Sequence, residues 1–189
     1  MYPTHQDTAA YAGDRPFIMC EYSHAMGNSN GSLADYWDTI LATPGLQGGF
    51  IWEWKDHGLS TTLPNGKKGF AYGGQFGEAI HDGNFVADGL MSADLVPHPA
   101  IQEVEWVYRP ATMEKKGANL VISNRRSFTN LDDLAATWEL NVGGSVRGSG
   151  ALEVPTVSPG QSVKLPMPCV TPTDPDAHLT VTFSQRAST

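Results

Sequence analysis

Two short apolar runs on either side of an amphipathic helix constrain the fold of this chain more than any other feature. The runs cover residues 17–20 (FIMC) and 49–52 (GFIW), and continuous runs of this length are typical of strands buried on both faces. Between them, residues 33–41 have apolar positions with helical spacing, and Ser32 is expected to cap the helix. Two such strands joined by a crossover helix form a right-handed parallel unit of the kind that builds α/β barrels.

One such unit is too small to close a barrel. A barrel needs eight strands and about 250 residues, whereas the composition of this chain changes near residue 110. Alone, the unit would leave backbone groups unpaired at both of its edges. We therefore expect residues 1–110 to be the C-terminal part of a (β/α)8 TIM barrel that belongs to a larger protein.

Short alternating runs dominate the rest of the chain, residues 111–189. Examples are residues 120–123 (LVIS) and 179–183 (LTVTF), which are separated by turns rich in Gly, Pro, Asn and Asp. This pattern predicts an antiparallel β-sandwich, and we expect the sandwich to be truncated in this chain. The predicted fold class is thus α/β plus all-β, with the barrel part first and the sandwich second.

Charge and apolar content exclude several classes of protein. The chain has 20 acidic and 12 basic side chains and a net charge of −8, which opposes binding to nucleic acid. We expect no membrane span, because no apolar stretch approaches roughly 20 residues, and no secretory signal is visible in the sequence. Cys20 and Cys169 lie far apart, so we expect free thiols and a cytoplasmic protein.

A carboxylate follows each of the two predicted strands. Glu21 comes directly after the first apolar run and Glu53 directly after the second. In α/β barrels this end of a strand is where the chemistry takes place, and a buried carboxylate is costly unless it has a partner or a function. From the pattern alone, Glu21 is either a catalytic nucleophile or the partner of an arginine at the mouth of the barrel.

Five segments resemble the β-galactosidases of glycoside hydrolase family 2. The resemblance covers residues 1–110, and from residue 111 onward it is one of architecture only, because a β-sandwich follows the barrel in that family. The segments are RPFIMCEYSHAMGNSNG (15–31), QGGFIWEW (47–54), YGGQFG (72–77), DGL (88–90) and PHPA (97–100).

The resemblance implies a retaining β-galactosidase that hydrolyses terminal β-D-galactosides such as lactose by double displacement. Glu21 stands at the position of the family's nucleophile, and Tyr2 at that of a tyrosine that hydrogen-bonds it. His24 matches a histidine that contacts sugar hydroxyls, and Trp52 matches the aromatic floor beneath galactose. Retaining enzymes need a second carboxyl group about 5 Å from the nucleophile.

That second carboxyl group is expected to lie outside this chain. In the family the acid/base is a glutamate preceded by asparagine, and no Asn-Glu pair occurs in the 189 residues. We therefore expect the isolated chain to be inactive. Glu53 is the local substitute, but its position favours pairing with Lys55 or with a backbone donor over catalysis.

The resemblance also implies bound cations. Residues 57–96 form a long glycine-rich connection with few helix or strand signals, and long loops that stay ordered are often functional. The family binds sodium here through a phenylalanine carbonyl and an asparagine, which match Phe85 and Asp88. We expect Asp88 to contribute to substrate binding as well. The magnesium ligands of the parent lie outside this chain, and no zinc spacing is present.

The partners implied are a galactoside substrate, the remainder of the parent chain and, in the parent, further copies in a homo-oligomer.

One alternative stays open, a non-catalytic carbohydrate-binding module. In that case Trp52, Trp54 and Tyr72 would hold the sugar and Glu21 would only hydrogen-bond it. Trp52 also has a purely structural interpretation as core filler, although Trp54 and Trp106 are the better candidates for the core.

Overall fold

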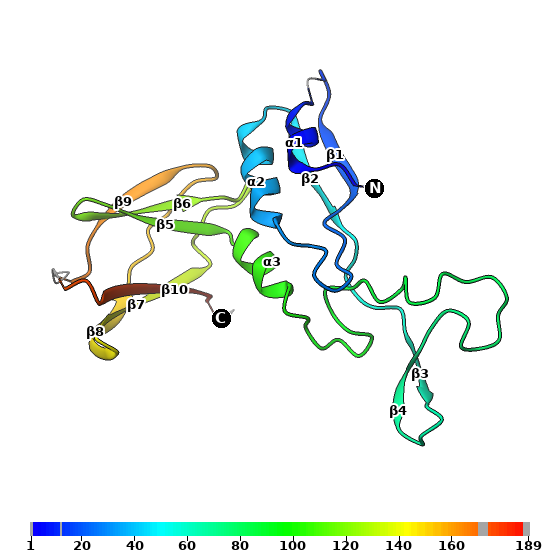
Figure 1. Ribbon diagram of the computed structural model, residues 1–189. Helices are drawn as coiled ribbons and strands as arrows, with labels where there is room; N and C mark the ends of the chain where they lie inside the picture. Colours follow the sequence, from blue (N-terminus) through cyan, green and yellow to red (C-terminus); the bar gives the residue numbers. More distant parts are fainter. Residues whose placement is uncertain (1, 12, 170–173, 187–189) are drawn as a thin grey trace. The chain divides into compact units, whose positions relative to one another are not determined.

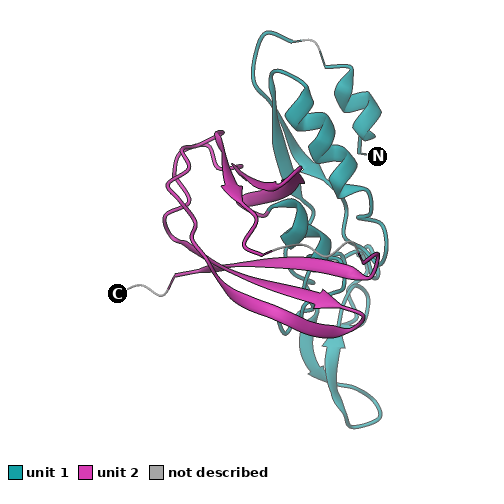
Figure 2. Cartoon of the chain, turned by 90° about the vertical axis from the view of Figure 1, so that its left-hand side faces the viewer, with its two compact units in different colours: residues 1–108 teal, residues 109–189 magenta. Residues whose placement is uncertain are grey.

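The computed structural model of the chain describes residues 2–11, 13–169 and 174–186. It divides into two compact units, residues 1–108 and residues 109–189 (Figure 2). The boundary expected at residue 110 lies two residues from this division. No helix in the described part of the chain has the length and apolar character that crossing a membrane requires.

The first unit contains the expected parallel unit of two strands and a helix. Strand β1 pairs in parallel with β2, and helix α2 connects them (Figure 1). The described residues contain no closed barrel. The elements of this unit are α1 (His5–Ala9), β1 (Phe17–Tyr22), α2 (Leu33–Ala42), β2 (Leu46–Ile51), β3 (Leu59–Thr62), β4 (Lys68–Ala71) and α3 (Ile101–Val107).

The core of the first unit lies between the two parallel strands and the helices. Met19 and Tyr22 of β1 pack with Leu33 and Ile40 of α2. The Tyr22 hydroxyl accepts a hydrogen bond from Trp37 Nε1 at 2.9 Å. Burial raises the pKa of Tyr22, so its hydroxyl stays protonated. The apolar face of α2 predicted from the sequence is therefore the one that covers the strands.

The prediction that both strands are buried on both faces is wrong. Met19 and Tyr22 are buried, but Ile18 is 55% exposed and Phe50 of β2 is 67% exposed. Successive side chains of a strand point to opposite faces, and α2 covers one face only. Within the described residues, no second layer covers the other face, which is the state expected of two strands taken from a barrel.

The predicted cap of α2 is also wrong. Ser32 adopts a left-handed conformation with φ of 63°, and its side chain makes no capping hydrogen bond. Instead, Glu103 Oε1 accepts from Leu33 N at 3.1 Å. The start of the helix is thus satisfied by a carboxylate 70 positions further along the chain, where a negative charge is favourable.

The long connection over residues 57–96 contains a hairpin that the sequence analysis missed. Strands β3 and β4 pair in an antiparallel register from Leu59 opposite Ala71 to Thr62 opposite Lys68. The turn holds Asn65 and Gly66, and Gly66 has a φ of 79° that side chains rarely adopt. An Asn-Gly pair between two short runs is a strong hairpin signal, so the sequence did carry the information.

The second unit is the predicted β-sandwich. Its two antiparallel sheets have the strand orders β5-β6-β9 and β10-β7-β8. Ile122 of β6 and Leu134 of β7 meet in one core with Leu131 and Val157. The strands are β5 (Ala111–Lys116), β6 (Asn119–Asn124), β7 (Leu134–Val142), β8 (Ser145–Leu152), β9 (Ser162–Pro166) and β10 (Ala177–Gln185).

Truncation of a core side chain is expected to destabilise the sandwich strongly. Ile122 is fully buried, so Ile122→Ala should lower the free energy of unfolding by about 3 kcal/mol through lost burial and the cavity left behind. Phe128 is 94% exposed, and Phe128→Ala is the control, expected within about 0.5 kcal/mol of wild type. Urea unfolding of both variants measures the difference, and equal losses would contradict the assignment of the core.

Candidate active site

Glu21 lies near the end of β1 and is held by Tyr2. The Tyr2 hydroxyl donates to Glu21 Oε2 at 2.8 Å, so the hydrogen bond expected from the resemblance is present. Burial, together with the hydrogen bond to Glu21, raises the pKa of Tyr2 to about 12. Tyr2 is therefore a protonated donor at neutral pH, and the carboxylate beside it is half-buried with one oxygen engaged.

Asp88 is the centre of a second group of polar contacts. Its side chain is 2% exposed, and its Oδ2 accepts from Trp52 Nε1 at 3.2 Å. The Nε2 atom of His24 lies 3.5 Å from the same oxygen, without the alignment of a hydrogen bond. One buried carboxylate thus joins the loop after β1 to the end of β2.

His24 links this group to Tyr2, the residue that hydrogen-bonds Glu21. Its ring stacks on Phe85 with ring centres 5.2 Å apart and planes 29° apart, and it lies 6.0 Å from the ring of Tyr2. The Ser29 hydroxyl donates to the carbonyl of His24, which holds the loop that follows β1. The structure therefore brings together the six residues predicted for the site: Tyr2, Glu21, His24, Trp52, Phe85 and Asp88.

Trp52 has the exposure that stacking on a sugar requires. It is 37% exposed, while its Nε1 donates a hydrogen bond to Asp88.

The two tryptophans predicted to lie in the core do not lie there, because Trp54 is 61% exposed and Trp106 is 65% exposed. That prediction is wrong, because Trp54 lies in the loop after β2 and Trp106 on an exposed part of α3.

Glu53 pairs with a different residue from the one expected. Its Oε2 lies 2.9 Å from His57 Nε2, so the expected pairing of its side chain with Lys55 is wrong. Burial and the neighbouring carboxyl group of Asp88 raise the pKa of Glu53, and His57 opposes this. Its backbone N–H donates to the Asp88 carbonyl at 2.9 Å. Glu53 therefore contacts Asp88 through its backbone N–H and also lies beside the Asp88 carboxyl group.

One oxygen atom of the site has the chemistry of a ligand for a small hard cation. Asp88 Oδ1 is buried and has no hydrogen-bond partner among the described residues. A bare carboxylate oxygen is a favourable ligand for sodium or a similar hard ion. The described residues contain no group of three or more His, Cys, Asp or Glu side chains placed to hold a metal, so further ligands would have to be backbone oxygens or groups from elsewhere.

Two residues near the site were missed in the sequence analysis. Asp56 Oδ1 accepts from Gly89 N at 2.8 Å, and His98 Nδ1 contacts the Gly89 carbonyl at 2.9 Å. His98 lies within the PHPA segment and Asp56 follows the WEW segment closely. Neither has a spacing that predicts a contact with Gly89, because the fold of the long loop brings them together.

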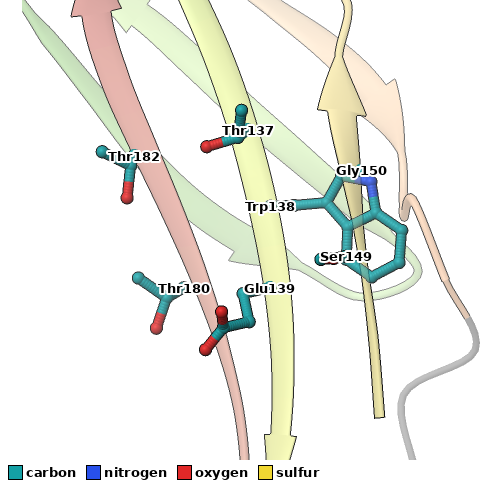
Figure 3. A pocket seen from close by; sticks show the side chains of 7 residues that line it. All are labelled: Thr137, Trp138, Glu139, Ser149, Gly150, Thr180 and Thr182. Carbon is teal, nitrogen blue, oxygen red and sulfur yellow. The ribbon is translucent and has the colours of Figure 1, made fainter. Parts of the chain in front are cut away.

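Two surface depressions are lined by none of the six residues predicted for the site. One, of about 590 Å³, is lined by residues that include Asn30, Ala87, His98 and Glu103. The other, of about 420 Å³, lies on sheet β10-β7-β8 (Figure 3). Figure 3 shows the hydroxyl and carboxylate side chains of β7 and β10 on one side of it and the Trp138 ring across β8. Glu139 is its single carboxylate, so it lacks the pair that glycoside hydrolysis needs.

Comparisons with known proteins agree with this arrangement. Residues 3–113 match a family model described as glycosyl hydrolases family 2, TIM barrel domain, and residues 120–189 match one described as β-galactosidase, domain 4. A β-galactosidase of Actinobacillus pleuropneumoniae is 45% identical over 88% of this chain and 16% of its own length. A β-galactosidase of Arthrobacter sp. (strain B7) is 39% identical over 82% of this chain and 16% of its own length.

These relatives are much longer than the chain, which spans about one sixth of their length. The barrel match nevertheless covers more than half of the chain, and it includes every residue of the candidate site except Tyr2. The second match falls on the β-sandwich. The chain therefore belongs to glycosyl hydrolases family 2, and consists of the C-terminal part of the TIM barrel domain followed by a β-sandwich.

Proposed function

We propose that this chain is the part of a retaining β-galactosidase that carries the nucleophile, Glu21, and much of the galactose-binding surface. One observation carries the proposal: the hydrogen bond from Tyr2 to Glu21 lies beside the cluster of His24, Trp52 and Asp88. A held carboxylate next to an exposed aromatic ring and buried polar groups supplies the nucleophile and a sugar-binding surface, which are two of the parts that sugar hydrolysis requires.

In the first step, Glu21 attacks the anomeric carbon of the galactoside. A bond forms from a carboxylate oxygen to that carbon, and the glycosidic bond breaks. Because Tyr2 engages Oε2, we infer that Oε1 is the attacking oxygen. The leaving oxygen takes its proton from an acid/base residue of the remaining parent chain. A galactosyl-enzyme ester on Glu21 results.

In the second step, water attacks the anomeric carbon and the ester bond breaks. The acid/base residue takes the proton of that water, and Glu21 leaves as a carboxylate. Tyr2 assists here, because a protonated phenol stabilises the negative charge that returns to Glu21. Its raised pKa of about 12 keeps the proton on the phenol throughout the neutral range.

Sugar binding is assigned to the cluster around Asp88. The exposed face of Trp52 would pack against the apolar face of galactose, and His24 and Asp88 would bind hydroxyl groups. Asp88, with the Phe85 carbonyl, would hold a monovalent cation, whose positive charge would favour a sugar hydroxyl at that position. No residue of this chain is assigned to magnesium.

The stereochemistry of the product tests the proposed function. The longer protein that carries this chain should hydrolyse an aryl β-galactoside much faster than the matching β-glucuronide or β-mannoside. Proton NMR of the first turnovers should show the β-anomer of galactose, because double displacement retains configuration. Appearance of the α-anomer first, or sugar binding with no turnover, would overturn the proposal, and the latter would favour a binding module.

The identity of the cation is expected to change substrate affinity. In sodium, potassium and a bulky organic cation, the parent's KM for galactosides should differ. Asp88→Ala should raise KM more than it lowers kcat, because the buried Asp88 acts in binding. Asp82→Ala, at an exposed acid of the same loop, is the matched control. An unchanged KM in all three cations and in Asp88→Ala would remove the cation from this site.

A further inference from the structure

Gly89, the residue after Asp88, is contacted by two side chains, Asp56 and His98, which we call the clamp. The segments on either side of Gly89 are bound by backbone hydrogen bonds: Glu53 N donates to the Asp88 carbonyl, and Leu90 N donates to the Glu53 carbonyl at 2.8 Å. The Gly89 peptide groups, however, are bound by side chains. Its N–H donates to Asp56 Oδ1 at 2.8 Å, and its carbonyl lies 2.9 Å from His98 Nδ1.

Both arms of this clamp have defined chemistry. A carbonyl oxygen only accepts, so His98 Nδ1 must carry a proton and donate to Gly89. The other ring nitrogen of His98 lies 3.7 Å from Asp56 Oδ2, so the two side chains also face one another. His98 N donates to the Leu90 carbonyl at 2.9 Å, which fixes the backbone that carries the ring.

Gly89 is the only residue type that this site accepts. A Cβ atom at position 89 would lie 2.3 Å from Asp56 N and 2.4 Å from the Lys55 carbonyl carbon, closer than any real contact. The absence of a side chain lets the two backbones touch, and the side chains of Asp56 and His98 close around the peptide. Asp88 lies in no helix or strand, so these contacts and the backbone hydrogen bonds with Glu53 fix its position.

We propose that Asp56 and His98 are positioning residues for galactoside binding, which act by clamping the Gly89 peptide and so holding Asp88 against Trp52 and His24. The proposal rests on the sugar-binding role proposed for Asp88. Neither residue needs to touch the substrate. Loss of one arm leaves a buried peptide group without its partner and lets Asp88 move, which weakens the contact with the hydroxyl group that Asp88 binds.

Deoxygalactosides report this contact selectively. Aryl β-galactosides that lack one hydroxyl at a time are compared in the longer protein that carries this chain, and kcat/KM is measured for each. Discrimination is the ratio of kcat/KM for the full galactoside to kcat/KM for the analogue. For the analogue that lacks the hydroxyl bound by Asp88, this ratio should be lower in Asp88→Ala than in wild type. In wild type that discrimination is expected to be about tenfold or more, because the missing hydroxyl leaves buried groups unpaired.

Asp56→Ala is expected to lose most of the discrimination against the same analogue and to raise KM about tenfold, with a smaller change in kcat. Asp56→Asn keeps an oxygen acceptor for the Gly89 N–H and should restore the discrimination. His98→Ala, whose side chain is 39% exposed, is the second variant. It removes the other arm and should act in the same direction even where Asp56→Ala fails to fold.

The outcomes separate this proposal from the proposed function. If Asp88→Ala loses discrimination while Asp56→Ala or His98→Ala keeps the wild-type pattern, the clamp is overturned and the binding role of Asp88 stands. If Asp88→Ala keeps the wild-type pattern with every analogue, the proposed binding role fails first and the clamp fails with it. Equal losses toward all analogues in the clamp variants would indicate a general structural defect and would also overturn the proposal.

Discussion

Glu21→Gln in the longer protein that carries this chain is expected to lower kcat by roughly four to six orders of magnitude, as removal of a catalytic nucleophile does. The amide cannot form the galactosyl ester, so the two-step pathway is closed. Substrate binding should change little, because Trp52, His24 and Asp88 are unaltered. Steady-state kinetics on an aryl β-galactoside, with binding measured separately by calorimetry, gives both values.

Two controls test whether the loss of kcat is specific to removal of the nucleophile. Glu53→Gln changes the neighbouring strand-end glutamate, which pairs with His57 and lies beside Asp88, and should cause a far smaller loss of kcat. Azide, a small nucleophile, should partly rescue Glu21→Gln on a substrate with a good leaving group by attacking the anomeric carbon in place of the missing carboxylate. Near-normal kcat in Glu21→Gln would contradict the assignment.

The isolated 189-residue chain is expected to show no measurable turnover of a chromogenic β-galactoside. Hydrolysis needs a second carboxyl group about 5 Å from the nucleophile, and we assign that group to the remaining parent chain. Glu53 does not replace it, because its carboxyl group is engaged with His57 and faces Asp88. The purified chain is compared with its own Glu21→Gln variant, after circular dichroism has shown that both are folded. Turnover above that of the variant would contradict this prediction.

The sequence predicted the elements whose signals are local. The apolar spacing of residues 33–41 located α2, and the alternating runs after residue 110 located the sandwich. Features set by distant residues were not predictable. The cap of α2 is Glu103, 70 positions away, and no rule of local sequence connects it to Leu33. The prediction that both strands are buried on both faces was wrong for the same reason. The second face of a strand is buried only by a further layer of structure, and α2 covers one face only.

The candidate site divides in the same way. The identities of Glu21, Tyr2, His24, Trp52 and Asp88 came from a resemblance carried by contiguous segments, and the structure brings those residues together. Their supporting contacts depend on the long loop after β2. That loop folds through a hairpin and brings Asp56 and His98 to Gly89. Pairwise contacts of this kind depend on three-dimensional packing, and neither residue type nor spacing signals them.

Covalent trapping tests the central claim, that Glu21 is the nucleophile of a retaining galactosidase, most directly. A 2-deoxy-2-fluoro-β-galactoside with a dinitrophenolate leaving group forms the galactosyl ester without protonation of the leaving oxygen, and the fluorine slows its hydrolysis. The longer protein that carries this chain is incubated with this reagent, digested with pepsin and analysed by tandem mass spectrometry. The account predicts a fluorogalactosyl adduct on Glu21, absent from Glu21→Gln. An adduct on any other residue, or release of dinitrophenolate with no adduct, would contradict it.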